Sequence, residues 1–335
     1  MMDASRKLTT KDQYRPKVSV IMATYNGARY LPQAVESILT QTFVNFEFII
    51  IDDGSTDQTS IILNSFQDPR IIRLKNEKNI GLTKSLNRGI QVSHGELIAR
   101  QDADDISLPE RLSCQVSFMD NHPEIGLLGT QIMRIDSEGH IIKGGSFYTD
   151  PIQLQQTLLT IIPFLHGTFI FRRVCLQDIG GSYNEEIPVA QDCDLLFRIS
   201  EKWDIANLAD TLYKFRQHEN SVTSHRKLDQ AHYLHINQDN AIKRRLAYGW
   251  GRLGLSRQSI PQWVRTADRR WLSERFVWWS AAARGIRKST ALQFLLLAFL
   301  IDVKNSSLSN YVKGILSRKI LSIVNKSNSI SPGGQ

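Results

Sequence analysis

Residues 46–57 read FEFIIIDDGSTD, an apolar run that ends in two adjacent carboxylates and a turn. A short, continuous apolar segment bounded by a turn signal is typical of a strand buried on both faces. The segment KVSVIMAT (17–24) has the same apolar, β-branched character. Both segments are therefore expected to be buried strands of one sheet.

Strand and helix signals alternate from this pair of strands onward. Leu31, Val35 and Ile38 recur at helical spacing in YLPQAVESILTQT. Further strands are expected at 70–76 and 96–100, and helices at 30–42, 59–66 and 81–93. This alternation predicts an α/β fold in which helices wrap a parallel sheet.

The pattern changes after residue 120. Residues 125–136 and 140–148 are expected to form a hairpin-rich insertion, residues 166–181 a further strand, and residues 191–203 a helix. Neither a GxxxxGK[ST] loop nor a GxGxxG loop occurs in the sequence. P-loop ATPases and dinucleotide-binding enzymes are therefore excluded.

Composition indicates a globular protein, because 41% of the 335 residues are hydrophobic and 22% are charged. Cys114, Cys175 and Cys193 are too scattered for a disulfide framework or a zinc site, and fit a reducing compartment. Residues 1–16 form a polar leader without the apolar core of a signal peptide. A cytoplasmic location is expected.

Charge divides unevenly along the chain. Residues 1–225 carry a net charge of −6, and residues 226–335 carry +14. Residues 269–288 contain both Arg and Trp, which favours either an interfacial membrane helix or a helical hairpin with its own core. The apolar run at 292–301 is too short to span a bilayer. Residues 226–335 are thus expected to be a basic, Trp-rich helical region that either contacts an anionic membrane or nucleic acid, or is simply solvated.

Two acidic loops follow predicted strands. Asp52 and Asp53 follow one strand, and Asp102, Asp104 and Asp105 follow another. In an open α/β sheet, ligands bind beyond the carboxyl ends of the strands. The second loop fits a site for Mg²⁺ or Mn²⁺, a phosphatase nucleophile or a solvated turn. An EF-hand is excluded because the DxDxDG pattern is missing.

Other residues at the same edge suit a nucleotide. Asp53, with Asp52, is placed to accept hydrogen bonds from a ribose hydroxyl or a base N–H. Tyr25 offers an aromatic face, and Asn26 offers a donor and an acceptor to a planar heterocycle. A nucleoside diphosphate needs base contacts, ribose contacts and a cation at its phosphates.

The stretch VSVIMATYNGARYLPQAVESILTQTFVNFEFIIIDDGSTDQT, followed by NIGLTKSLNRGI and ARQDADDISLPERL, closely resembles glycosyltransferase family 2. The resemblance covers roughly residues 17–225, which would form the catalytic domain. It implies a GT-A fold, a Rossmann-like mixed sheet flanked by helices, and a nucleotide-sugar donor. A mainly helical extension would follow the catalytic domain.

The resemblance also implies donor-site roles. Thr24, Tyr25 and Asn26 match the family's TYN motif and would contact the nucleobase. Asp52 to Ser55 match its DDGS loop, with Asp53 favoured for the base N–H. Lys84 and Arg100 are assigned to the base or the phosphates.

The metal-binding DxD motif of the family corresponds to Asp102-Ala103-Asp104. Asp104 would be the direct ligand of Mn²⁺ or Mg²⁺, and Asp102 would lie at the ribose or the metal. Asp105 would be structural and would cap the helix that begins near Pro109. His218, in YKFRQHENSVTS (213–224), matches a position that ligates the metal in some relatives.

On the acceptor side, AQDCDLLFRIS (190–200) matches the segment that carries the family's catalytic base. Asp192 is the candidate base, although Gln191 stands where the family usually has Glu. Asp194 is the second candidate and is expected to be structural. His166, Gly167 and Thr168 echo a family segment near the acceptor.

The implied reaction is an inverting transfer from a nucleotide-sugar, with UDP favoured over dTDP and GDP, to a hydroxyl of a glycan or lipid-linked acceptor. Surface polysaccharide biosynthesis and peripheral contact with the inner face of the plasma membrane would suit such an enzyme. The alternatives are a nucleotidyltransferase, whose Gly-rich triphosphate loop is missing from TYNGARY, and a non-catalytic carbohydrate-binding or scaffold protein. A nucleic-acid binder is disfavoured.

Overall fold

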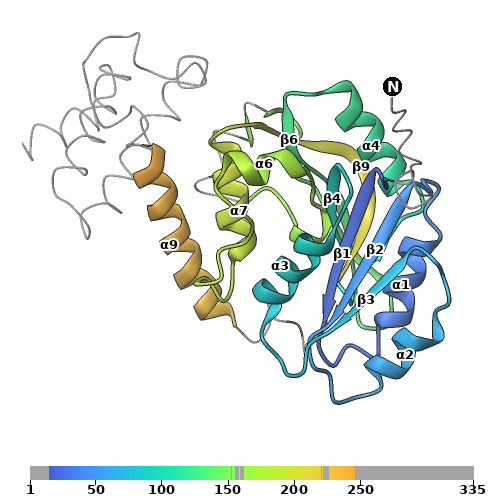
Figure 1. The fold of residues 1–335 in the computed structure, drawn as a ribbon. Helices are drawn as coiled ribbons and strands as arrows, with labels where there is room; N and C mark the ends of the chain where they lie inside the picture. Colours follow the sequence, from blue (N-terminus) through green and yellow to red (C-terminus); the bar gives the residue numbers. More distant parts are fainter. Residues whose placement is uncertain are drawn as a thin grey trace, which may run out of the picture. The chain divides into compact units, whose positions relative to one another are not determined.

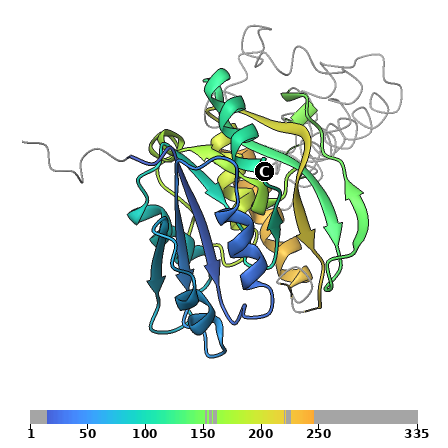
Figure 2. The ribbon, with the colours of Figure 1, turned by 90° about the vertical axis from the view of Figure 1, so that its right-hand side faces the viewer.

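The computed structural model describes residues 15–151, 153–154, 158, 162–219, 221 and 226–245. These residues form a curled mixed sheet with helices on both faces (Figures 1 and 2). The strands are β1 (Val18–Thr24), β2 (Phe46–Asp52), β3 (Ile71–Lys75), β4 (Leu97–Arg100), β5 (Ile106–Ser107), β6 (Ile125–Ile135), β7 (Ile141–Gly145), β8 (Ile170–Arg172) and β9 (Asp204–Arg216). The helices are α1 (Leu31–Leu39), α2 (Thr59–Ser65), α3 (Leu82–Val92), α4 (Arg111–Asn121), α6 (Arg173–Asp178), α7 (Gln191–Ser200), α9 (Lys227–Arg245) and the 3₁₀ turn η1 (His166–Thr168).

The first half of the sheet is parallel, as the alternating pattern predicts. β1 lies between β2 and β4, and β3 pairs with the outer side of β2. Every residue of β1, β2 and β4 is buried. Their continuous apolar runs are thus explained by helices that cover both faces of these strands.

Alternate residues of β1 and β2 face different helices. Val20 and Ile50 belong to the apolar core that includes Leu31 and Val35 of α1. On the opposite face, α3 lies so close that a Cβ on Gly89 would be 2.7 Å from Cγ2 of Ile21 and 2.9 Å from Cδ1 of Ile51. The missing side chain at position 89 therefore sets how closely α3 approaches the sheet.

The second half of the sheet is mixed. The strand order continues from β4 through β8, β6 and β9 to β5, and β7 pairs with β6. β8 is antiparallel to β4 and β6, whereas β6 and β9 are parallel to each other. In Figure 2 these green to yellow strands lie beside the blue strands of the first half.

The expectation of a hairpin-rich insertion at 125–148 was only half right. β6 and β7 do form an antiparallel hairpin. β6, however, also pairs with β8 and β9, so it is a central strand of the sheet and not part of an insertion. Its partners lie more than 40 residues further along the chain, and local patterning contains no signal for such pairing.

Residues 246–335 lie outside the described residues, and so do the predictions made for the segments 269–288 and 292–301. The same holds for residues 1–14 of the polar leader. The helix α9 packs on α7, where Asn237 Nδ2 donates to the carbonyl of Ala190 at 2.7 Å and Arg244 Nε pairs with Glu201 at 2.9 Å. Within the described part of the chain, every helix falls short of the length and apolarity that a bilayer span requires.

The close approach of α3 gives a stability prediction. Gly89→Val should lower the free energy of unfolding by about 1–3 kcal/mol, because the new methyl groups overpack the contact with Ile21 and Ile51. Gln91→Val places the same side chain on the exposed face of α3 and should cost about 0.5 kcal/mol or less. Urea denaturation of both variants measures the difference. Equal stabilities would contradict the tight packing of α3.

Candidate functional site

The carboxyl ends of β1, β2 and β4 bring the predicted donor residues to one edge of the sheet. Thr24 and Asp52, the last residues of β1 and β2, are paired in the register. Arg100, the last residue of β4, lies opposite Ile21 of β1. The acidic loop at 102–105 begins at this edge. The convergence of the two acidic loops that the sequence predicts is therefore present in the fold.

Each carboxylate of the acidic loop has its own hydrogen-bond partner. Asp102 Oδ1 accepts a hydrogen bond from Arg100 Nη2 at 2.6 Å. Asp104 Oδ2 lies 2.9 Å from His218 Nε2. Asp105 Oδ1 accepts from the backbone N–H of Arg216 at 2.7 Å. This arrangement answers the electrostatic problem posed by three carboxylates within four residues.

Asp102 is enclosed on several sides. The Arg100 guanidinium is 2% exposed and also donates from Nη1 to the carbonyl of Ile21 at 3.2 Å. The backbone N–H of Asp102 donates to the hydroxyl of Tyr213 at 3.2 Å. A Cβ on Gly167 would clash with that hydroxyl and lie 2.8 Å from Asp102 Oδ2. Arg100 therefore orients Asp102, and its buried position disfavours the direct phosphate contact that the sequence suggests.

Asp104 is more exposed than Asp102, whereas its partner His218 is mostly buried. The Asp104 side chain is 34% exposed, compared with 28% for Asp102. The His218 ring lies 4.9 Å from the ring of Tyr30, which restricts its orientation. The structure thus brings together two of the three predicted metal ligands, although 114 residues separate them in sequence.

The donor set of this pair fits a divalent cation at a diphosphate. Within the described residues, His, Cys, Asp and Glu side chains do not form any group of three or more that could hold a metal alone. Mg²⁺ and Mn²⁺ in nucleotide sites need only one or two protein ligands, because phosphate oxygens and water supply the others. Asp104, His218 and Asp102 remain predicted ligands on this basis.

Asp105 is structural, as expected, but it does not cap a helix. It is 1% exposed and its carboxylate is bonded to the backbone of β9, while the residue preceding α4 is Glu110, which makes no side-chain cap. Burial raises the pKa of the Asp105 carboxyl well above its usual range, and the charges of Asp104 and Asp102 add to the increase. The capping expectation was wrong because the Asp105 carboxylate accepts a hydrogen bond from the backbone of β9, a strand more than 100 residues further along the chain.

Arg216, which sequence analysis missed, connects the acidic loop to the rest of the site. It is 2% exposed, and its Nε donates to the carbonyl of Asp104 at 2.9 Å. Its Nη2 donates to Gln33 Oε1 at 2.7 Å, and its guanidinium lies 4.6 Å from the ring centroid of Tyr30. The available signal was its place two residues before His218.

In the first acidic loop, protein groups already occupy most acceptor positions. Asp52 Oδ1 accepts from the backbone N–H of Ser55 at 2.9 Å, and Oδ2 accepts from the hydroxyl of Ser60. Burial acts to raise the pKa of Asp52, but these hydrogen bonds outweigh it and lower the pKa. The carboxylate of Asp52 therefore shapes the loop, and its contact with a ribose stays a prediction.

Asp53 holds the start of α3. Its carboxylate accepts from Asn76 Nδ2 at 2.6 Å and from the backbone N–H groups of Ile80 and Gly81, each at 2.9 Å. A carboxylate has about four acceptor positions, so one position is left beyond these three bonds. The predicted contact with a base N–H remains compatible with this geometry.

The three residues of the TYN turn differ in exposure and in hydrogen bonding. Tyr25 is 49% exposed, as an aromatic platform for a base requires. Asn26 adopts a left-handed backbone (φ 50°), and its Oδ1 accepts from the backbone N–H of Thr56 at 2.9 Å. Asn26 thus ties the two loops together and has lost the free acceptor expected for the nucleobase. Thr24 Oγ1 is buried and lacks a hydrogen-bond partner among the described residues, and its contact with the nucleobase stays a prediction.

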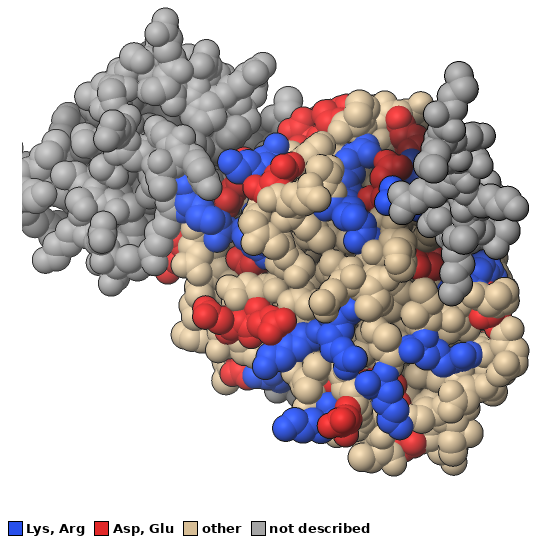
Figure 3. Space-filling model, in the orientation of Figure 1, with Lys and Arg blue, Asp and Glu red and all other residues tan. Residues whose placement is uncertain are grey.

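Lys84 lies on the exposed side of α3. It belongs to a group of Lys and Arg side chains that Figure 3 shows gathered over α3 and the adjoining end of β3. Arg73, Lys75, Lys78 and Arg88 are the other exposed members on these segments. Their charges raise the local concentration of anions at this edge, but no contact ties Lys84 itself to a phosphate position.

The acceptor-side candidates surround the first turn of α7. Asp192 is half-buried there, two residues after Ala190, whose left-handed backbone (φ 57°) precedes the helix. Burial raises the pKa of the Asp192 carboxyl, with an added contribution from the charge of Asp102. A carboxylate with a raised pKa is a stronger general base.

Asp194 and His166, the other acceptor-side residues, make different contacts. Asp194 is 3% exposed and pairs with Arg198 at 2.8 Å, so it is structural, as expected. His166 Nε2 lies 2.7 Å from the hydroxyl of Tyr183. Burial and the charge of Arg100 lower the pKa of His166 well below its usual range, so the imidazole is neutral at pH 7.

Comparison with known proteins places this geometry among sugar transferases. Residues 19–180 match the family model "Glycosyl transferase family 2". A putative glycosyltransferase EpsE of Bacillus subtilis is 35% identical over 207 residues, which are 60% of this chain and 73% of that protein. An uncharacterized glycosyltransferase of Haemophilus influenzae is 32% identical over 62% of this chain and 68% of that protein.

Solved structures share the fold. The crystal structure of S. aureus TarS 1-349 in complex with UDP-GlcNAc superposes with a TM-score of 0.57 at 22% identity, over 90% of this chain and 91% of that chain. The mannosyltransferase PcManGT from Pyrobaculum calidifontis, in complex with GDP-Man and Mn²⁺, gives 0.53 at 18% identity over 90% and 84%. The expected GT-A fold is thereby confirmed.

The contact between Gly167, Tyr213 and Asp102 gives a coupling prediction. Gly167→Ala should lower the free energy of unfolding by about 1–3 kcal/mol, because the methyl group meets the Tyr213 hydroxyl. Tyr213→Phe removes that hydroxyl and keeps Cζ, which lies 2.6 Å from the added Cβ, so only part of the overlap is relieved. The double variant should therefore be more stable than the sum of the single effects by about 0.5 kcal/mol. Denaturation of all four proteins measures the coupling, and strict additivity would disprove the contact.

Proposed function

Because this chain belongs to glycosyltransferase family 2 and is a glycosyltransferase, we propose that it moves a sugar from a UDP-sugar to a hydroxyl group of a glycan or a lipid-linked acceptor. The proposal includes dependence on a divalent cation and inversion at the anomeric carbon. One observation supports it: Asp104, whose side chain is 34% exposed, pairs with His218, whose side chain is 12% exposed, beside Asp102. A diphosphate with its cation fits this set of ligands.

The nucleotide lies across the carboxyl ends of β1 and β2. The exposed ring of Tyr25 stacks on the base, and the remaining acceptor position of Asp53 takes the base N–H. The buried hydroxyl of Thr24 supplies a further polar contact. Asp102, held by Arg100, faces the ribose or the cation. Preorganised partners of this kind reduce the entropy lost on binding.

Asp104 and His218 hold the cation, with Asp102 as the neighbouring carboxylate. Such an ion, when bound, offsets the negative charge that develops on the departing diphosphate. The basic group over α3 and β3 adds a positive field at the same edge. Mn²⁺ is favoured, because a histidine nitrogen is a better ligand for Mn²⁺ than for Mg²⁺.

Asp192 acts as the general base. It accepts the proton of the acceptor hydroxyl while that oxygen forms its bond to the anomeric carbon. The bond between this carbon and the diphosphate oxygen breaks on the opposite side, so the configuration inverts. The raised pKa of Asp192 and its place in the first turn of α7 support this role. Gln191 is 5% exposed, so the missing family glutamate does not leave an open charge position beside the base.

The same proposal names a class of donor and a class of acceptor. We favour UDP, because TarS, which has the higher TM-score, is described in complex with UDP-GlcNAc. GDP is the second choice, because PcManGT is described with GDP-Man. In this proposal the transfer extends a glycan for surface polysaccharide, and it takes place at the inner face of an anionic membrane. Its membrane contact would come from residues 226–335, of which the structure describes 226–245.

The cation site is tested by thermal shift with UDP, GDP, dTDP and CMP, each with and without Mn²⁺. UDP with Mn²⁺ should raise Tm by about 5 °C or more at about 100 times its Kd. Asp104→Ala should abolish the dependence on Mn²⁺, because it removes the exposed carboxylate ligand. Asp210→Ala removes an equally charged but remote exposed side chain and should behave as wild type.

The outcome separates the rival functions. A shift with GDP in place of UDP would change the donor class and leave the cation site intact. If no nucleotide shifts Tm in a folded protein, a non-catalytic scaffold becomes the better description. Binding of UDP that ignores both Mn²⁺ and Asp104 would remove the metal assignment.

The base is tested by Asp192→Asn, which keeps the size of the side chain and removes its proton affinity. UDP binding should be unchanged, while transfer to acceptor should fall about 10²- to 10⁴-fold. Asp210→Asn serves as the matched control for the loss of one carboxylate. Transfer at the wild-type rate by Asp192→Asn would move the base to another residue.

A further inference from the structure

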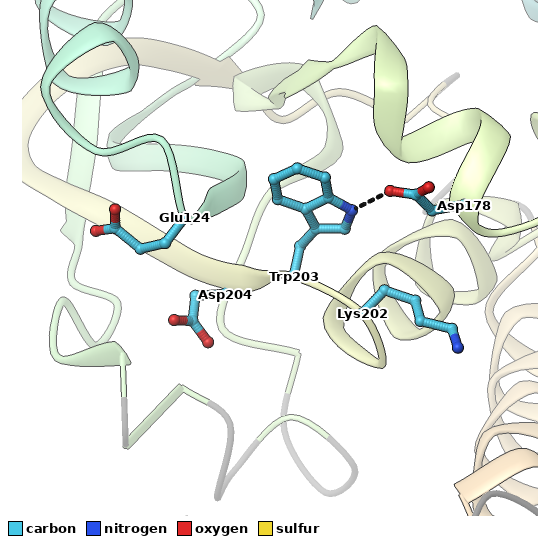
Figure 4. A pocket seen from close by; sticks show the side chains of 5 residues that line it. All are labelled: Glu124, Asp178, Lys202, Trp203 and Asp204. Atoms are coloured by element: carbon cyan, nitrogen blue, oxygen red, sulfur yellow. Dashed lines mark hydrogen bonds between the residues drawn. The ribbon is translucent and has the colours of Figure 1, made fainter.

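Trp203 lines a hollow in the surface that contains no residue of either acidic loop (Figure 4). Its volume is about 510 Å³, and it is lined by Glu124, Asp178, Lys202, Trp203 and Asp204. Small-molecule sites typically have volumes of about 300–1,000 Å³. The hollow is thus large enough to hold one or two sugar rings.

The hollow is remote from the proposed transfer site. Asp204 is the first residue of β9, and Arg216, which contacts the acidic loop, is the last. At about 3.3 Å per residue, the two ends lie on the order of 40 Å apart along the strand. A ligand bound at Trp203 therefore cannot be the donor or the hydroxyl that reacts.

Trp203 is a fixed aromatic platform. A Cβ on Gly126 of β6 would clash with the Cβ of Trp203 and lie 2.7 Å from its Cγ, so the side chain lies directly on a strand position that lacks a side chain. The indole Nε1 donates to Asp178 Oδ2 at 2.9 Å, which sets the rotation of the ring (Figure 4). The ring is nonetheless only half-buried. A rigid, partly exposed ring loses little entropy when a ligand packs on it.

Charged groups flank this platform on two sides. In Figure 4, Glu124 and Asp204 lie on one side of the indole, and Asp178 and Lys202 on the other. A hydrogen bond from the backbone N–H of Glu124 to its own carboxylate, with smaller contributions from His122, lowers the pKa of this exposed carboxyl. Ionised carboxylates only accept hydrogen bonds, so a ligand here must donate.

This combination selects for one ligand chemistry. The three carboxylates outnumber the single ammonium, so the hollow disfavours phosphates, nucleotides and acidic sugars. A pyranose ring has one face of weakly positive C–H groups, which the negative face of an indole attracts. Its hydroxyl groups donate to carboxylates and accept from an ammonium group. The hollow offers the indole face and the carboxylates together.

We propose that this hollow binds a sugar ring of a glycan that carries no acidic groups. The ring packs on the indole of Trp203, and its hydroxyl groups donate to Glu124 and Asp204. The inference goes beyond the proposed function, because binding here requires neither the nucleotide nor the base. Such a site holds a glycan chain at a second point of the enzyme while transfer takes place elsewhere.

The test reads binding at Trp203 directly. The chain has six tryptophans, so protein labelled with 5-fluorotryptophan gives a small set of ¹⁹F resonances, and Trp203→Phe identifies the one from Trp203. The probes are hexamers of glucose in α-1,4 and β-1,4 linkage, of N-acetylglucosamine and of glucosamine. At least one should shift the Trp203 resonance saturably, with a Kd on the order of 1 mM. UDP with Mn²⁺ should leave this resonance unchanged.

Paired variants test the role of the carboxylates. Glu124→Gln with Asp204→Asn keeps the shape of both side chains and should weaken binding of the same hexamer about tenfold or more. Glu36→Gln with Asp210→Asn makes the same charge change at exposed positions elsewhere and should leave the affinity unchanged. These readouts do not involve nucleotide or transfer, so their failure is separate from failure of the proposed function.

Three results would overturn the inference. The first is a Trp203 resonance that no hexamer shifts at about 10 mM, well above the expected Kd. The second is a shift caused by tetramethylammonium and by none of the neutral hexamers, which would make the hollow a cation site. The third is equal affinity in wild type and in the Glu124→Gln, Asp204→Asn variant.

Discussion

Charge balance around the acidic loop is the constraint on which the rest of the structure depends. A buried carboxylate without a partner is strongly unfavourable, and this loop contains three carboxylates in four positions. Arg100, Arg111 and Arg216 are the largest fully buried side chains among the described residues. Each of them lies against this loop or the strand ends beside it. Removing one member of such a set leaves a charge uncompensated, which typically costs about 3–5 kcal/mol.

These arginines also determine which parts of the chain meet. Arg111 comes from α4, and its Nη2 donates to the carbonyl of Arg100 at 2.7 Å, so the helix after the loop is bonded to the strand before it. Burial lowers the pKa of Arg111 to about 10, which still leaves it charged at pH 7. Arg216 brings the end of β9 to the same place, and with it His218. The proposed metal ligand is thus positioned by the same contacts that balance the charge.

The helix α3 links the donor side of the site to the acceptor side. At its beginning, Gly81 donates to Asp53. Further along, Thr83 Oγ1 donates to the carbonyl of Ile187 at 3.1 Å, and Asn87 exchanges hydrogen bonds with the backbone of Tyr183. The segment that these bonds hold leads into α7 and Asp192. The predicted donor residue Asp53 and the segment that leads to the candidate base are therefore both hydrogen-bonded to α3, which itself packs tightly on β1 and β2.

The sequence by itself determined the parallel half of the sheet, the two acidic loops and the family. Continuous apolar runs, helical spacing and turn residues are local signals, and they place Asp52 and Asp102 at strand ends without knowledge of the fold. Only the tertiary structure decided that β6 is a central strand, that Asn26 and Asp52 serve the loops themselves, and that Arg216 carries His218 to Asp104. It also created the hollow at Trp203 from three separate segments. These features depend on pairings between residues tens to more than a hundred positions apart, and local patterning does not encode which distant groups satisfy a buried charge or hydrogen bond.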